Sequence, residues 1–132
     1  MSDFENYHFE EKIVEILKKE ADNNKYENFG NPYLTIYQIL IIWAKNNPES
    51  YQDINKPIGG AGAGNNALSI NISRELSLRI NDGRIKNIEK GQLSHLELSN
   101  QVIFLGPNNE QIQPTSQSAG YAISLFRYKE NK

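Results

Sequence analysis

The sequence predicts an α+β protein in which three helices precede a small antiparallel β-sheet. Three observations favour this class: helical patterns fill the first half, a glycine-rich segment introduces one further periodic segment, and short strand patterns close the chain. A length of 132 residues suits one hydrophobic core. We therefore expect a single domain over residues 1–132, with its N-terminal helical part over residues 8–54.

The first helix is predicted from Phe9 to Ala21. Apolar side chains recur there every three or four residues, and charged side chains occupy the opposite side, as in an amphipathic surface helix. Residues 22–32 are rich in Asn, Gly and Pro, which indicates a connection.

A second helix is predicted to begin near Thr35, whose hydroxyl can cap it while Gln38 reaches back. Pro48 stops this helix two residues beyond Asn46. Apolar residues surround nearly its whole circumference, so we expect it to lie in the centre of the fold. Pro48 is also typical of a first helical position, which predicts a short helix through about Ile54.

Residues 67–80 fit two secondary structures. Apolar and polar residues alternate there as in a strand, but a helix would gather one apolar stripe of Leu68, Ile72, Leu76 and Ile80. The segment is long for a strand, and Glu75 and Arg79 have the spacing of a helical ion pair, so we predict a helix over residues 67–81. If the segment is instead a strand, the protein has N-terminal helices and a larger antiparallel sheet.

A β-hairpin and a final strand are predicted over residues 101–128. The run QVIFL at 101–105 and the run EQIQ at 110–113 flank a Gly-Pro-Asn-Asn turn, as in a hairpin. Alternating residues over 121–126 predict the last strand.

The resulting order of elements is similar to that of a winged-helix domain, in which the third helix enters the major groove of DNA and the hairpin forms the wing. Nucleic-acid binding is therefore the first functional expectation. Arg and Asn read bases, and Ser hydroxyls approach phosphates. The candidate residues are Ser73, Arg74 and Arg79 on the third helix, Arg84 and Lys86 just after it, and Asn108 and Asn109 at the hairpin tip.

The charge distribution gives this expectation limited support. All four arginines lie in residues 67–132, where eight bases and six acids give a formal charge of +2. Residues 1–66 carry ten acids and six bases, a charge of −4, and the pI of 5.7 is a poor electrostatic match for a duplex. The alternative is a protein-interaction or accessory module with a foreign partner or a second copy, because several of the seven tyrosines lie in polar segments.

The glycine-rich segment IGGAGAGNN, residues 58–66, resembles a phosphate-binding loop in composition only. In the P-loop template, Asn65 and Asn66 stand where Lys and Ser or Thr are required, and the dinucleotide template also fails at Asn65. What remains is a small-anion or nucleotide-phosphate site built from backbone amides, with the candidates Gly60, Gly62, Gly64 and Asn65. The competing interpretation is a connection whose glycines permit positive φ.

Catalysis, cofactors and metals have no support in the sequence. The absence of cysteine excludes thiol catalysis, disulfides and zinc ribbons, and it suits a reducing cytosol. His8 and His95 are the two histidines, and His95 with Glu97 lacks the downstream cysteines of a zinc deaminase. We therefore expect a non-enzymatic binding module without cofactor or metal.

The longest apolar run, residues 33–44, is shorter than the ~20 residues of a membrane-spanning helix. The polar, acidic N-terminus lacks the pattern of a secretory signal. The expected location is the cytoplasm, with no membrane partner.

Overall fold

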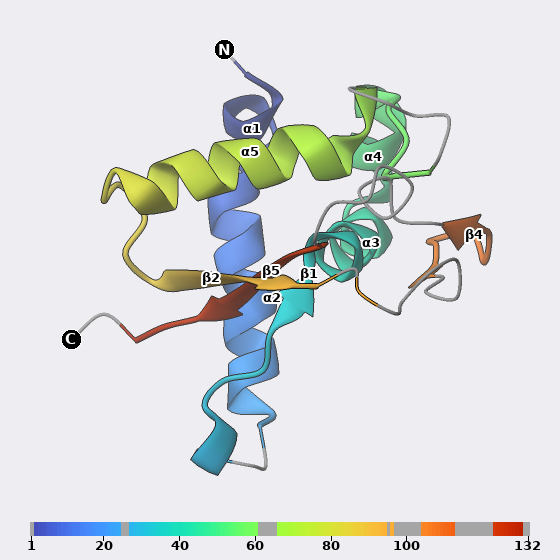
Figure 1. Ribbon diagram of the computed structural model, residues 1–132. Coiled ribbons are helices and arrows are strands. Elements are labelled where there is room, and N and C mark those ends of the chain that lie inside the picture. The colour runs from blue at the N-terminus through green and yellow to red at the C-terminus, as the bar shows by residue number, and fades with distance from the viewer. Residues whose placement is uncertain are drawn as a thin grey trace.

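The computed structural model describes residues 2–24, 27–60, 66–94, 96, 104–112 and 123–130. Within these residues it contains five α-helices and antiparallel strands, which confirms the predicted α+β class (Figure 1). The helices are α1 (Asp3–Asn6), α2 (Phe9–Asp22), α3 (Ile36–Asn46), α4 (Pro48–Ile54) and α5 (Leu68–Asn81), with a 3-10 turn at Glu27–Phe29. The strands are β1 (Leu34–Thr35), β2 (Ile88–Leu93), β3 (Phe104–Leu105), β4 (Gln111–Ile112) and β5 (Ile123–Tyr128).

The predicted helices of the N-terminal half are confirmed with small shifts at their ends. The start of α3 is fixed by the expected pair of hydrogen bonds: the Gln38 amide donates to Thr35 Oγ1 at 3.1 Å, and the Thr35 amide donates to Gln38 Oε1 at 2.7 Å. Pro48 begins α4 as expected, while the Asn47 side chain donates to the Trp43 carbonyl instead of capping α4. The short helix α1 was not predicted, since it has only four residues.

The ambiguous segment is helical. Residues 68–81 form α5, so the helical interpretation is confirmed and the alternative of a strand here is wrong. Gly83 follows the end of α5 with a φ of +84°, a conformation in which glycine is favoured over other residues.

The three-stranded sheet is formed by other strands than the sequence predicted. Its order is β1-β5-β2 with both neighbours antiparallel to β5, and neither β1 nor β2 was expected. The final strand is confirmed, two residues later than predicted, and Tyr121 and Ala122 lie outside the described residues. The hairpin is confirmed in its inner part, because β3 pairs with β4 in a separate two-stranded sheet. Its outer residues, 101–103 and 113, lie outside the described part of the chain.

The core is centred on α3, as the apolar pattern predicted. Trp43 is fully buried, with the Phe9 ring of α2 at 4.6 Å and the Tyr51 ring of α4 at 6.1 Å. On another side of α3, Tyr37 stacks on Phe104 of the hairpin at 5.3 Å. Figure 1 shows α2 crossing behind α5 and the three-stranded sheet, with the hairpin beside α3. None of the helices in the described residues has the length and apolarity needed to cross a membrane.

Candidate nucleic-acid interface

Helix α5 buries one side and exposes the other. Its buried stripe is Leu68, Ile72 and Leu76, which pack into the core beside α3 and β2. At 100° per residue, the opposite side carries a row that we call the outer face. The outer face consists of Ile70, Asn71, Arg74, Ser77, Leu78 and Asn81.

Arg74 is the charged residue of the outer face, and it is exposed. Among the described residues it has no ion-pair partner, so its guanidinium is available to a ligand. Ser73 lies beside it in a shallow hollow of about 300 Å³ that Ser69, Ser77 and Ser124 also line. The predicted pair Ser73 and Arg74 is thus together on an accessible side of α5.

Arg79 points away from the outer face. Its side chain is 11% exposed, forms ion pairs with Glu75 and Glu5, and stacks over the Phe4 ring at 4.4 Å. Its guanidinium is therefore engaged in holding α1 against α5. The same contacts keep the Glu75 carboxylate off the outer face, which has no acidic residue of its own.

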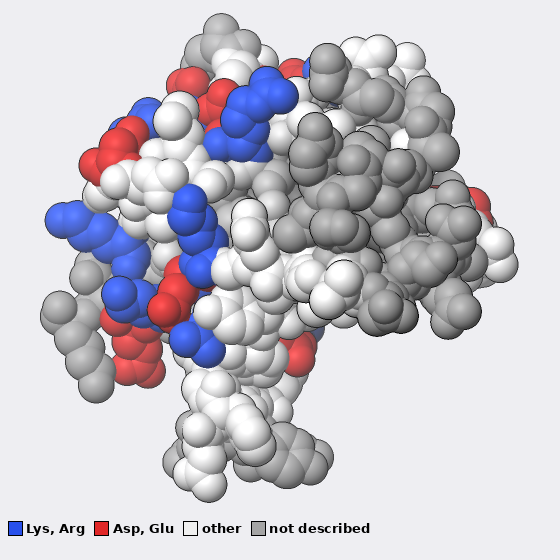
Figure 2. All heavy atoms as spheres, in the orientation of Figure 1, with Lys and Arg blue, Asp and Glu red and all other residues white. Residues whose placement is uncertain are grey.

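Arg84 and Lys86 follow the C-terminal end of α5, and both are exposed. Arg84 is paired with Asp82, because its backbone amide and its Nε donate to the two carboxylate oxygens at 3.1 and 2.7 Å. Lys86 has no ion pair among the described residues. Figure 2 shows Lys and Arg atoms over α5 and β2 with acidic side chains between them, so the surface is mixed rather than uniformly basic.

Asp82 provides a pH-dependent check of the Arg84 contact. Hydrogen bonds from Arg84 lower the pKa of the Asp82 carboxyl, so the pair stabilises the fold above the ordinary pKa of aspartate and this contribution is lost as pH falls through the lowered value. Arg84→Ala should return the Asp82 pKa toward its ordinary value in an NMR titration of its carboxyl carbon. Arg74→Ala should leave it unchanged. An Asp82 pKa that is equal in the wild type and Arg84→Ala would contradict the contact.

Lys90 is a basic residue that the sequence prediction missed. It lies on β2, and its Nζ donates to Ser77 Oγ on the outer face of α5 at 2.9 Å. Since β2 was not predicted, nothing placed Lys90 beside α5. Pairing of β2 with β5 was needed to bring Lys90 to Ser77.

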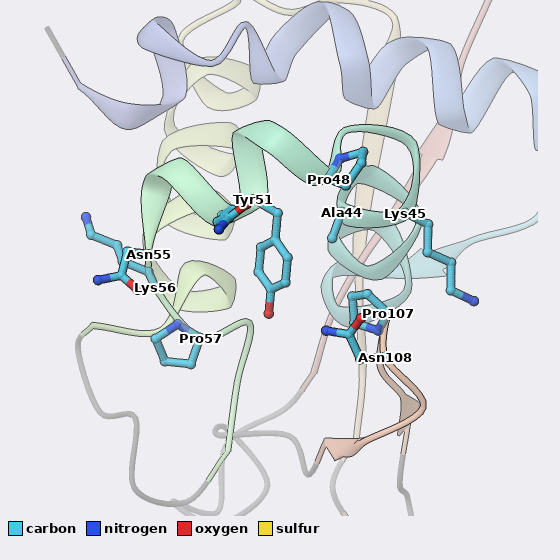
Figure 3. A pocket seen from close by; sticks show the side chains of 10 residues that line it. Ala44, Lys45, Pro48, Tyr51, Asn55, Lys56, Pro57, Pro107 and Asn108 are labelled. Atoms are coloured by element: carbon cyan, nitrogen blue, oxygen red, sulfur yellow. The ribbon is translucent and has the colours of Figure 1, made fainter.

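Asn108 and Asn109 lie in the turn between β3 and β4, beside α4 rather than with Arg84 and Lys86. Asn109 has a φ of +65°, and the Asn108 amide donates to Glu110 Oε2 at 2.9 Å. Asn108 lines a hollow of about 700 Å³ between this turn and α4 (Figure 3). The hairpin tip and the outer face therefore form two separate surfaces.

The hollow beside α4 is polar, with Lys45, Lys56 and Tyr51 among its residues. In Figure 3 the Tyr51 hydroxyl points between Pro57 and Pro107, whereas Lys45 points away. Burial, followed by the charge of Glu110, raises the pKa of the Tyr51 hydroxyl, so this phenol stays protonated. Lys56 is paired with Asp3 at 2.5 Å, which engages its charge.

Of the glycine-loop candidates, Gly60 is described and has a φ of +127°, whereas Gly62, Gly64 and Asn65 lie outside the described residues. Beyond the loop, the first two amides of α5 are already engaged. The Leu68 amide donates to the Pro57 carbonyl at 2.8 Å, and the Ser69 amide donates to the Ile58 carbonyl at 3.0 Å. An anion at this helix start would have to use other donors, and anion binding by the loop stays a prediction.

In the residues that the structure describes, no three His, Asp or Glu side chains gather as metal ligands, and His95 lies outside those residues. Comparison with known proteins adds no identity: no family model, curated protein or solved structure matches this chain.

Proposed function

We propose that the protein is a winged-helix-like module that binds duplex DNA through the outer face of α5. The observation that carries this proposal is an accessible third long helix set against an antiparallel sheet, with an arginine at its centre that has no ion pair in the described part of the chain. A recognition helix needs such exposure to enter the major groove. The three long helices α2, α3 and α5 precede the long strands β2 and β5, in the order expected from the sequence.

The sheet order supports the same proposal. β1 immediately precedes α3 and pairs with the last strand, β5, which lies between β1 and β2. In the sequence, the paired strands β3 and β4 come between β2 and β5, as a wing hairpin does, although their turn lies beside α4 and not at the outer face. Helix α4 and the glycine-rich segment lengthen the connection from α3 to α5.

Local charge also supports duplex binding, although the net charge is −2. The outer face has Arg74 as its one charged side chain, and Lys90 and Lys86 extend the positive charge from β2 and from the segment before it. Arg79 and Arg84 instead neutralise neighbouring acids. With about three phosphate-facing cations, binding should be modest and should weaken with salt by a slope of about −3 in log units.

The test is fluorescence polarisation with a short labelled duplex at low salt. Arg74→Ala should weaken binding about tenfold, the loss expected for one arginine contact to a base or its phosphate. Lys18→Ala is the matched control, because Lys18 is an exposed cation of α2 and its removal changes the net charge equally. We expect this control to retain wild-type affinity.

Two results would overturn the proposal. One is the absence of duplex binding by the wild type at tens of micromolar protein. The other is equal weakening by Arg74→Ala and Lys18→Ala, which would indicate a general charge effect. Light scattering on the same sample distinguishes the rival class, since a mass that rises with concentration indicates a self-association surface.

A further inference from the structure

We propose that Ile70 and Leu78 contact the methyl groups of thymines that flank a guanine bound by Arg74. This inference rests on the proposed function and specifies the duplex sequence that the outer face recognises. Its basis is one row of three side chains, apolar, cationic and apolar, on the accessible side of α5.

The spacing of the row fits the spacing of base pairs. Ile70, Arg74 and Leu78 are four residues apart, so successive members are separated by about 6 Å along the helix. Base pairs are stacked at about 3.4 Å, so a helix aligned with the groove places successive members of the row about two base steps apart. The three side chains can therefore contact different base pairs at the same time.

The core does not account for the two apolar side chains. The buried stripe of α5 is complete without them, and Leu78 is 54% exposed while Ile70 is half-buried. No acidic residue lies on the same face, because Glu75 is turned toward Arg79. Ser77 and Lys90 lie beside the row. There the Lys90 ammonium group can contact a backbone phosphate and so fix how deeply α5 enters the major groove.

The chemistry of the major groove then selects the bases. Thymine presents its C5-methyl group there, and guanine presents the N7 and O6 acceptors that a guanidinium binds in bidentate fashion. An aliphatic side chain buries the methyl group of thymine, whereas cytosine offers an amino donor that Ile70 and Leu78 cannot satisfy. The predicted preference is for a guanine that has a thymine two base steps away on each side, on one strand.

The experiment compares three short duplexes by fluorescence polarisation with the full chain. The first has on one strand a guanine with a thymine two base steps away on each side. The second replaces every thymine by deoxyuridine, and the third replaces every guanine by 7-deazaguanine. Loss of one buried methyl contact should weaken binding about fourfold. The deoxyuridine duplex lacks both methyl contacts, so we expect it to bind the wild type about fifteenfold more weakly, and we expect the 7-deazaguanine duplex to bind about tenfold more weakly.

Variants assign these effects to residues. Leu78→Ala should reduce the difference between the thymine and deoxyuridine duplexes, and Arg74→Ala should remove the difference made by 7-deazaguanine. Leu105→Ala is the matched control, because Leu105 lies on β3 and is 59% exposed. Circular dichroism checks that each variant is folded.

The outcomes separate this inference from the proposed function. If the wild type binds the thymine and deoxyuridine duplexes equally, methyl recognition is wrong while duplex binding stands. The same conclusion follows if Leu78→Ala keeps the full difference. If the wild type binds none of the three duplexes, the proposed function fails together with the inference.

Discussion

Trp43→Ala should lower the free energy of unfolding by about 3–5 kcal/mol, the largest effect that we expect from a single substitution. Trp43 is fully buried: its ring packs on that of Phe9 at 4.6 Å and meets the edge of the Tyr51 ring at 6.1 Å. Alanine would leave a cavity where α2, α3 and α4 meet. Chemical denaturation followed by circular dichroism measures the loss.

Phe29→Ala is the control for this prediction. It also removes a large aromatic side chain, but Phe29 is 82% exposed, so we expect little change in the free energy of unfolding. Trp43→Phe adds a finer comparison. The indole N–H is buried without a hydrogen-bond partner among the described residues, so phenylalanine should cost less than alanine. Equal stability of Trp43→Ala and the wild type would contradict the central position of α3.

Arg79→Ala should destabilise the fold by about 1–2 kcal/mol, even though Arg79 lies on the proposed DNA-binding helix. The substitution removes the ion pairs to Glu75 and Glu5 and the contact with the Phe4 ring, which together hold α1 against α5. The loss of stability is small because Glu5 is half exposed and can be solvated after the change. Denaturant unfolding and hydrogen exchange of the α1 amides measure the effect.

Arg74→Ala is the matched control, since it removes the same side chain five residues earlier on the same helix. Arg74 is exposed and has no ion pair within the described residues, so its loss should leave stability nearly unchanged. The two variants should therefore have different effects: Arg79→Ala should reduce stability, and Arg74→Ala should reduce duplex binding. Loss of duplex binding by a folded Arg79→Ala, equal to that of Arg74→Ala, would show that Arg79 contacts the ligand.

Elements with a strong local signal could be predicted from the sequence. The period of α2, the Thr35 and Gln38 cap and the apolar circumference of α3 depend on residues close in the chain. For α5, the choice between helix and strand depended on its length and on the spacing of Glu75 and Arg79, which form the expected ion pair. Local spacing was therefore sufficient for α2 to α5, but not for the short helix α1.

Strands β1 and β2 could not be predicted because distant residues determine them. β1 has only two residues, and they form a strand because they pair with Leu125 and Phe126. β2 contains Lys90, Gly91 and Gln92, which show no alternation of apolar residues. Glycine at position 91 is explained by a tertiary contact: a Cβ there would lie 3.4 Å from the Tyr33 ring, which no local pattern reveals.

The candidate residues had mixed outcomes for a similar reason. Residue type identified the arginines, but the positions of Glu5, Glu75 and Asp82 determine which arginines are engaged elsewhere. Arg74 and Arg79 were grouped as candidates on one helix, and only the structure shows that Arg79 is engaged by partners on α1. Lys90 could be placed beside α5 only once the pairing of β2 with β5 was known.

The two backbone hydrogen bonds at the start of α5 allow the glycine-rich segment to change in length. The amides of Leu68 and Ser69 are tied to the carbonyls of Pro57 and Ile58, so the ends of the intervening segment are clamped by residues outside it. Doubling the length of such a closed loop costs only about 0.6 kcal/mol of chain entropy. Insertions and deletions between Ile58 and Ala67 can therefore accumulate while the register and orientation of α5 are preserved.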